Sequence, residues 1–154
     1  MSTSVLHDTI VTERQFDCKT DQVFQAWSSE ADKRPWFANS DGWENYEYRL
    51  DFRVGGQEYD RSRAVTLGFE SIYDARYEDI VDNQRIVCAY TMTIDGKRLS
   101  SSLLTLEFSP TNDGTLLRLT EQIAAYGSSE DIAKRLDGWK WILGNLDSHL
   151  HTNK

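Results

Sequence analysis

The chain has 154 residues, of which 39% are hydrophobic and 12% aromatic, and its formal net charge is −8. This length predicts a single domain over residues 1–154 whose core needs no disulfide or metal to fold, and the hydrophobic content excludes a disordered chain. The negative charge argues against non-specific binding to nucleic acid or anionic lipid, because like charges repel.

The N-terminal part predicts one strand followed by two short helices. Residues Ile10–Phe16 have the composition of a strand. Thr20 or Asp21 can cap a short helix, since their side chains accept hydrogen bonds from exposed backbone N–H groups. Pro35 then disturbs the chain, so residues 29–37 are expected to form a second short helix or a turn.

Hydrophobic and polar residues alternate through the middle of the chain. Turn-favouring residues divide this region at Gly55-Gly56, Asp82-Asn83, Asp95-Gly96 and Asn112-Asp113-Gly114. Four apolar rows lie between the turns: Tyr46, Tyr48, Leu50, Phe52 and Val54; Ile86, Cys88, Tyr90, Met92 and Ile94; Leu104, Leu106 and Phe108; Leu117 and Leu119. A period of two with one polar face predicts an antiparallel sheet with one buried face. About six strands are expected here.

The C-terminal part predicts one long helix. Ser128 and Asp131 suit a capping box at its start. Its apolar stripe consists of Ile132, Leu136, Trp139, Leu143, Leu146 and Leu150. The element order therefore predicts an α+β fold, in which a curved antiparallel sheet of about seven strands wraps around the helix. A gap between sheet and helix can remain as a cavity, and ligand sites are mostly apolar cavities with a few polar groups.

Neither a membrane span nor a targeting signal is visible. No apolar run approaches the ~18 residues that a span needs, and Met1–Asp8 lacks a signal-peptide pattern. A cytoplasmic protein is expected, with Cys18 and Cys88 as free thiols because they lack CxxC spacing. His149 and His151 lie near the chain end, so no metal site is expected, and no cofactor is implied.

Several local motifs follow one another in the order of a known family. They are Arg14-Gln-Phe16, Val23-Phe24-Gln-Ala26-Trp27, Trp36, Asp51-Phe-Arg-Val-Gly-Gly56, Tyr77-Glu-Asp-Ile80, Arg85-Ile-Val87, Gly114-Thr-Leu-Leu-Arg-Leu-Thr120, and Gly138-Trp139 with Leu143 and Leu146. In these motifs the chain resembles the START-like (SRPBCC) superfamily, and within it the branch like the C-terminal domain of the activator of heat-shock protein 90 ATPase. Ala75 departs from the glycine common in that branch, which affects local packing only.

The resemblance implies a helix-grip fold with a cavity, and no reaction. The superfamily includes lipid and hormone carriers, polyketide cyclases and co-chaperone modules, and it has no shared set of catalytic residues. A shared fold is a weak guide to function.

Glu121 is the sharpest single candidate for a functional residue. It continues the inward row of Leu117 and Leu119, where a carboxylate is costly unless it is paired or protonated. It can serve as a ligand anchor or as a general acid or base with a raised pKa. Alternatively it is a structural residue that lies near solvent at the strand end or pairs with an arginine. Arg14 poses the same alternative: it can meet an anionic ligand or pair with an acid such as Glu121 or Asp79.

Aromatic residues form the second group of candidates. Rings with polar tips suit a cavity that holds a partly polar organic molecule, and an ordinary aromatic core is the alternative. The cavity candidates are Trp36, Phe37, Trp43, Tyr48, Tyr59, Tyr73, Tyr77, Tyr90 and Trp139. Trp141 lies about 180° around the helix from the apolar stripe. It should face outward, where it is a candidate for a partner or homodimer interface.

Three functions compete. The first is binding of a small apolar or aromatic molecule in the cavity. The second is a co-chaperone-like module that binds a heat-shock protein 90 homologue. The third is a cyclase- or hydrolase-type enzyme in which Glu121 or a tyrosine carries a proton.

Overall fold

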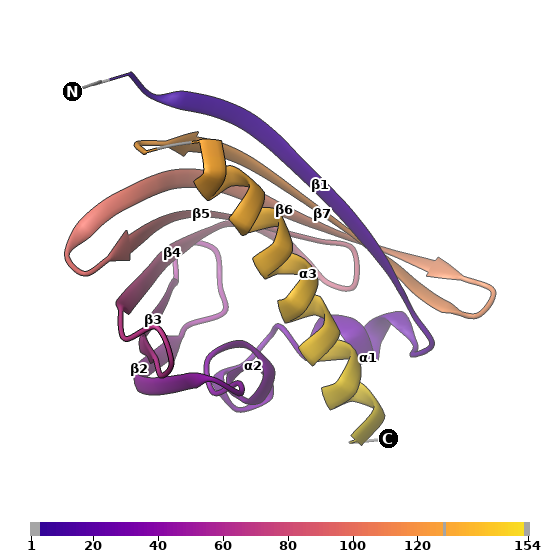
Figure 1. Ribbon diagram of the computed structural model, residues 1–154. Coiled ribbons are helices and arrows are strands. Elements are labelled where there is room, and N and C mark those ends of the chain that lie inside the picture. The colour runs from indigo at the N-terminus through magenta and orange to yellow at the C-terminus, as the bar shows by residue number, and fades with distance from the viewer. Residues whose placement is uncertain (1–3, 128, 153–154) are drawn as a thin grey trace.

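The computed structural model describes residues 4–127 and 129–152. Within these residues the elements are β1 (Leu6–Phe16), α1 (Thr20–Gln25), α2 (Glu30–Phe37), β2 (Trp43–Leu50), β3 (Gln57–Ala64), β4 (Glu70–Val81), β5 (Arg85–Ile94), β6 (Lys97–Thr111), β7 (Gly114–Ala125) and α3 (Ser129–Thr152). The α+β element order expected from the sequence is confirmed. Figure 1 shows the curved sheet bending around α3, which is the predicted helix-grip arrangement.

The strands form one antiparallel sheet in the order β1-β7-β6-β5-β4-β3-β2. Strands β2 to β7 follow one another as hairpins, and β1 pairs with β7, so β1 and β2 are the two edges. The predicted turns lie where they were expected: Asn83 and Asp95 take left-handed backbone angles, with φ of 62° and 48°. Gly114 is required at its turn, because a Cβ there would collide with the carbonyl oxygen of Phe16.

The first predicted apolar row is wrong at two of its positions. A β-bulge lies between Asn45 and Glu47, and it interrupts the alternation at Tyr46, which is 42% exposed. The strand β2 ends at Leu50, so Val54 belongs to the connection to β3 and is 57% exposed. An extra residue in one strand shifts all later side chains to the other face, which periodicity alone does not reveal.

The helix starts differ in part from the prediction. Lys19, not Thr20 or Asp21, is the N-cap of α1, and the Gln22 side chain accepts a hydrogen bond from the Lys19 backbone N–H at 3.2 Å. Ser29 caps α2 by accepting from the Asp32 backbone N–H at 3.1 Å. The helix α3 has 24 residues, in agreement with the long helix that was expected. The predicted cap at Ser128 lies outside the described residues.

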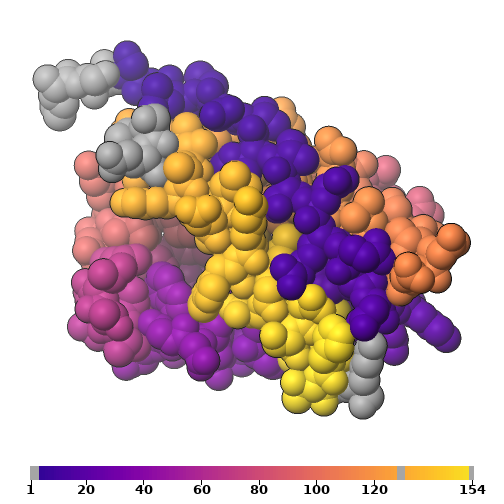
Figure 2. Space-filling view, turned by 45° about the vertical axis from the view of Figure 1, so that its right-hand side comes forward, coloured from indigo at the N-terminus to yellow at the C-terminus, as the bar shows by residue number. Residues whose placement is uncertain are grey.

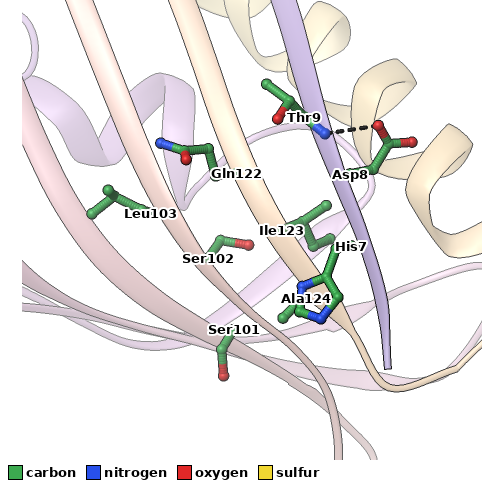
Figure 3. Close-up of a pocket in the computed structure, with 9 residues that line it drawn as sticks. All are labelled: His7, Asp8, Thr9, Ser101, Ser102, Leu103, Gln122, Ile123 and Ala124. Atoms are coloured by element: carbon green, nitrogen blue, oxygen red, sulfur yellow. Dashed lines mark hydrogen bonds between the residues drawn. The ribbon is translucent and has the colours of Figure 1, made fainter. Parts of the chain in front are cut away.

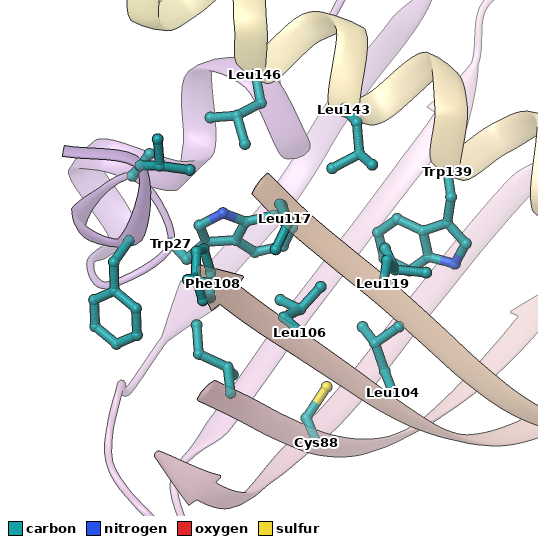
Figure 4. Packing of buried hydrophobic residues seen from close by; sticks show 14 of the residues in the cluster. Trp27, Cys88, Leu104, Leu106, Phe108, Leu117, Leu119, Trp139, Leu143 and Leu146 are labelled. Carbon is teal, nitrogen blue, oxygen red and sulfur yellow. The ribbon is translucent and has the colours of Figure 1, made fainter. Parts of the chain in front are cut away.

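The apolar stripe of α3 packs on the concave face of the sheet. Trp139, Leu143 and Leu146 are buried and point toward strands β6 and β7, as Figure 4 shows. The helix α1 and the segment after it close one end of this core with Phe24 and Trp27. Burial of each large apolar side chain stabilises the fold by about 1.5–3 kcal/mol. In the part of the chain that the structure describes, no helix has both the length and the apolar composition for a bilayer crossing.

Candidate functional site

The concave side of the sheet divides into two halves with different chemistry. The apolar half surrounds the second half of α3 and consists of Phe16, Trp27, Trp36, Leu106, Phe108, Leu117, Leu119, Leu143 and Leu146. The polar half lies toward the N-terminal part of α3. It consists of Lys33, Tyr48, Glu58, Asp60, Tyr73, Tyr77, Tyr90, Ser100, Ser102, Glu121 and Arg135. Strand register brings these polar residues together, since Tyr48, Asp60 and Tyr73 are cross-strand neighbours, as are Tyr90 and Ser102.

Glu121 is the centre of one hydrogen-bond network in the polar half. Its side chain is fully buried, and its Oε1 accepts from the Tyr90 hydroxyl and the Trp139 indole N–H, both at 2.7 Å. Its Oε2 accepts from the Ser102 hydroxyl and from Nη1 of Arg135, both at 2.6 Å. A carboxylate has about four acceptor positions, so these donors occupy them all. Glu121 therefore organises its neighbours and has no acceptor position left for a substrate proton.

The arginine partner of Glu121 comes from α3. Arg135 is nearly buried, with 11% of its side chain exposed, and it also donates to the hydroxyls of Tyr90 and Ser100 at 2.9 and 2.8 Å. Arg14 forms the expected structural ion pair with an acid, but its partner is neither Glu121 nor Asp79. Arg14 donates to Asp147 of α3 at 2.9 Å, because α3 crosses β1 at that point.

A second buried ion pair lies on the other side of the polar half. Lys33 of α2 lies 2.8 Å from both carboxylate oxygens of Glu58, and the two side chains are 4% and 0% exposed. The hydroxyls of Tyr48 and Tyr77 donate to the same carboxylate at 2.6 and 2.9 Å. Neither Lys33 nor Glu58 was expected from the sequence. The strand of Glu58 has no apolar row, so its inward face was not apparent.

Aromatic rings connect the two ion pairs. The ring centres of Tyr73 and Tyr90 are 4.6 Å apart, those of Phe37 and Tyr73 are 5.2 Å apart, and those of Phe37 and Trp139 are 6.5 Å apart. The Lys33 ammonium lies 4.2 Å from the centre of the Phe37 ring. Seven of the candidates thus come together: Phe37, Tyr48, Tyr73, Tyr77, Tyr90, Glu121 and Trp139.

Three other candidates lie elsewhere. Trp36 packs against Trp27 in the apolar half, with ring centres 4.7 Å apart. Trp43 pairs with Phe69 at the start of β2, away from the main core. Tyr59 lies on the outer face of the sheet against Arg49, because it alternates with the inward Glu58. Trp141 is 45% exposed on α3, so its outward position is confirmed.

Burial keeps the hydroxyl and thiol groups of this region protonated. It raises the pKa of the Tyr73, Tyr77 and Tyr90 hydroxyls well above the usual value. It also raises the pKa of the Cys88 thiol to about 12. The tyrosines therefore act as hydrogen-bond donors, and Cys88 is not a thiolate nucleophile at neutral pH. Burial raises the pKa of the Asp60 carboxyl to about 6, so this group titrates nearest to neutrality among them.

The residues that the structure describes form open hollows on the outer face of the sheet, away from α3, and two of them are large. The larger, of about 630 Å³, lies over β1, β6 and β7 and is shown in Figure 3. The smaller, of about 360 Å³, lies over β3 to β6, and Ser101 lines both. On the other side of the sheet, Figure 2 shows a recess between α3 and the middle strands. Partly exposed side chains of the concave side include Phe37, Asp60, Met92 and Arg135.

The last turn of α3 contributes a polar cluster that the sequence did not suggest. His151 lies 2.9 Å from Asp17 and 3.1 Å from Asp147, and hydrogen bonds to the Asp147 carbonyl and to Asp17 raise its pKa. Such a trio is of a kind that can hold a metal ion. Here Arg14 already supplies the cation to Asp147, so the cluster fastens the end of α3 to β1.

Comparisons with known proteins give a family and a fold. The family model described as "Activator of Hsp90 ATPase homolog 1-like protein" matches residues 17–151. A solved structure of an uncharacterized protein from Rhizobium leguminosarum is 40% identical, with 97% of each chain covered and a TM-score of 0.90. The Mll3558 protein from Rhizobium loti is 38% identical over 95% of this chain and 99% of its own, with a TM-score of 0.85.

More distant structures show the fold alone. An AHSA1-like protein from Aeromonas hydrophila is 19% identical over 95% of this chain and 94% of its own, with a TM-score of 0.72. The comparison with curated proteins gave no match.

Proposed function

The chain belongs to the family of activator of Hsp90 ATPase homolog 1-like proteins, and we propose that it binds a small apolar or aromatic molecule between the sheet and α3. The observation that carries this proposal is the polar half itself. Two buried ion pairs are joined there by aromatic rings on the concave face, next to a fully apolar core. Apolar walls with a few oriented polar groups are the usual composition of a ligand site.

Stability alone does not account for the polar half. Replacing a buried ion pair by packed apolar residues is often neutral or stabilising by about 1–4 kcal/mol, because desolvation offsets the attraction. The apolar half shows that this sheet and helix can pack without buried charges. Two fully bonded ion pairs on the same concave face therefore favour a role in recognition.

Partly exposed side chains indicate where a molecule would enter. Phe37 of α2, Asp60 of β3, Met92 of β5 and Arg135 of α3 belong to the concave side and are each accessible in part. The recess in Figure 2 lies on this side of the molecule. A molecule entering here would meet the partly exposed Phe37 ring first and would reach the Tyr73 ring, which is buried against Phe37, after it.

The test is a ligand screen with a matched pair of tyrosine variants. Native mass spectrometry and thermal shift would be run with a panel of apolar and aromatic molecules. Tyr73→Leu changes the inward ring, and Tyr59→Leu makes the same change on the outer face. We expect an affinity loss of about tenfold or more for Tyr73→Leu, since a buried aromatic contact and its area are lost, and none for Tyr59→Leu. A screen without any binder would refute the proposal, as would equal losses for both variants.

Binding to a heat-shock protein 90 homologue is a second candidate. It is favoured by the family description and by Trp141, which is 45% exposed on the outer side of α3. Exposed tryptophans are enriched at protein interfaces. A pull-down and an ATPase assay with wild type and Trp141→Ser would test it. An unchanged ATPase rate at saturating protein would remove this candidate.

A further inference from the structure

Asp60 occupies a particular position in the polar half. It lies on the concave face of β3, with Tyr48 as its neighbour on β2 and Tyr73 as its neighbour on β4. It is partly exposed, whereas Glu58 and Ser62 on the same face of β3 are buried. Asp60 is therefore a carboxylate of the concave side that a molecule can reach.

In the described part of the chain, one of the two carboxylate oxygens of Asp60 accepts hydrogen bonds. Oδ1 of Asp60 accepts from the Asn45 side-chain amide at 2.9 Å and from the Ser62 hydroxyl at 2.7 Å. Among residues 4–127 and 129–152, no donor is hydrogen-bonded to Oδ2, and no cation is paired with Asp60. The contacts to Oδ1 fix the orientation of the carboxyl group and leave Oδ2 available.

The nearby cations already have partners. Lys33 is paired with Glu58, and Arg135 is paired with Glu121. These two pairs cancel in charge, so ionised Asp60 adds one uncompensated negative charge to the polar half. A partly buried carboxylate without a counter-ion is unfavourable, and it takes up a proton or a cation. Burial, together with the charge of Glu58, raises the pKa of the Asp60 carboxyl to about 6, in agreement with this charge count.

Aromatic rings surround the same place. Tyr48 and Tyr73 flank Asp60 in the sheet, and the Phe37 ring centre lies 6.3 Å from that of Tyr48 and 5.2 Å from that of Tyr73. Ring faces attract organic cations through their negative electrostatic potential, and a carboxylate supplies the counter-charge. The net charge of −8 adds a long-range attraction for cations.

We infer that Asp60 is the recognition residue for a protonated amine, so that the molecule bound between sheet and α3 is a small organic amine with an apolar or aromatic body. This inference rests on the proposed function and specifies its ligand class. The amine would donate to Oδ2 of Asp60, and its body would contact the rings of Phe37 and Tyr73. A carboxylate-bearing molecule would be repelled by the same group.

The test uses three probes of nearly equal size: 2-phenylethylamine, 2-phenylethanol and phenylacetate. Their affinities would be measured by calorimetry at about pH 7.5 with wild type, Asp60→Asn and Asp74→Asn. Asn can keep the contacts of Oδ1, while Asp74→Asn removes the same charge from the outer face. We expect the amine to bind about tenfold more tightly than the alcohol, because hydrogen bonds to charged groups are the stronger ones. Asp60→Asn should abolish that preference, and Asp74→Asn should keep it.

A measurement on the wild type keeps the inference testable if a variant does not fold. The Asp60 carboxyl carbon would be titrated by NMR with and without 2-phenylethylamine. A bound amine favours the ionised carboxylate, so the pKa of Asp60 should fall when the amine is added. Four residues face Asp60: Lys33 from α2, Glu58 from the same strand β3, Tyr48 from β2 and Tyr73 from β4. None of them should lose its own partner when the amine binds.

The outcomes separate the inference from the proposed function. If 2-phenylethanol or phenylacetate bound as tightly as 2-phenylethylamine or more tightly, the inferred amine class would be wrong, and the proposed ligand site would remain supported. Amine binding that Asp60→Asn does not weaken, or an unmoved Asp60 titration, would overturn the role of Asp60. If none of the three probes binds while other apolar molecules do, the amine class is wrong. If nothing binds at all, the proposed function fails as well.

Discussion

The two halves of the concave side are built from the same sheet and the same helix, but one is packed with apolar side chains and the other with a buried polar network. In the apolar half, Leu143 and Leu146 of α3 pack on Leu117 and Leu119 of β7 in a core of hydrophobic side chains. In the polar half, the preceding turns of α3 place Arg135 and Trp139 on a buried glutamate. The change takes place within about two turns of one helix.

This difference separates the main source of stability from the part of the molecule to which we assign the proposed recognition. The apolar half provides burial, which is the dominant favourable contribution to folding. The polar half contributes little net stability, because its charges lose their hydration when they are buried. Its intact hydrogen bonds nevertheless make it rigid and sensitive to the loss of any single partner.

The largest effect is expected for Glu121→Gln. The change leaves Arg135 as an uncompensated buried charge, and breaking one partner of a buried pair costs about 3–5 kcal/mol. Urea unfolding would measure the loss. Glu107→Gln, an exposed glutamate on β6, is the control and should change stability by less than about 0.5 kcal/mol. Equal stability of the two variants would mean that the polar half carries no buried charge.

A loss of about 3 kcal/mol is expected for Leu146→Ala in the apolar half. The side chain is fully buried, so the change removes apolar contacts and leaves a cavity. Leu67→Ala makes the same change at a residue that is 77% exposed and should be nearly neutral. Thermal unfolding of both variants checks the prediction. If Leu146→Ala also abolished ligand binding in a folded protein, the two halves would not be functionally separate.

Trp139→Phe should cost about 1–3 kcal/mol, because it removes one donor from a buried carboxylate while keeping most of the ring. Trp141→Phe, two residues further along α3, touches the exposed side of the helix and should change stability by less than about 0.5 kcal/mol. Denaturant unfolding with fluorescence detection compares the two. Similar losses of stability for the two variants would show that the indole of Trp139 contributes nothing to the polar half.

A smaller effect of opposite sign is expected for Asp60→Asn. The folded-state pKa of Asp60, about 6, lies above the usual 3.8, so the fold loses stability as the pH rises from about 3.8 to about 6, and the full loss remains at higher pH. A shift of about two pKa units corresponds to about 3 kcal/mol at 1.36 kcal/mol for each unit, and solvent at the partly exposed carboxylate reduces this value. The variant should therefore be more stable than wild type at about pH 7.5, by about 1–2 kcal/mol. The gain should shrink as the pH falls from about 6 toward the usual pKa of 3.8 and vanish at about pH 3, where the carboxyl group is mostly protonated in both states. Unfolding at the two pH values measures it, and a loss of stability at pH 7.5 would contradict it.

The sequence determined the elements of this fold because their signals are local. Asn83, Asp95 and Gly114 mark turns through their own backbone preferences, and the period of two marks strands. The stripe from Ile132 to Leu150 marks a helix with one buried face. Glu121 was identifiable for the same reason, since it interrupts an otherwise apolar row.

Only the tertiary structure decided which polar groups meet. Lys33 and Glu58 are separated by 25 residues, and Arg135 reaches Glu121 only because α3 lies across the sheet. Arg135 stands four residues before Trp139 and thus on the same helix face, which was the one signal that could have indicated it. The strand register placed Asp60 inside and Tyr59 outside, although β3 has no apolar row from which to read its faces. Periodicity records which residues share a face, whereas the partner across that face depends on how distant segments pack.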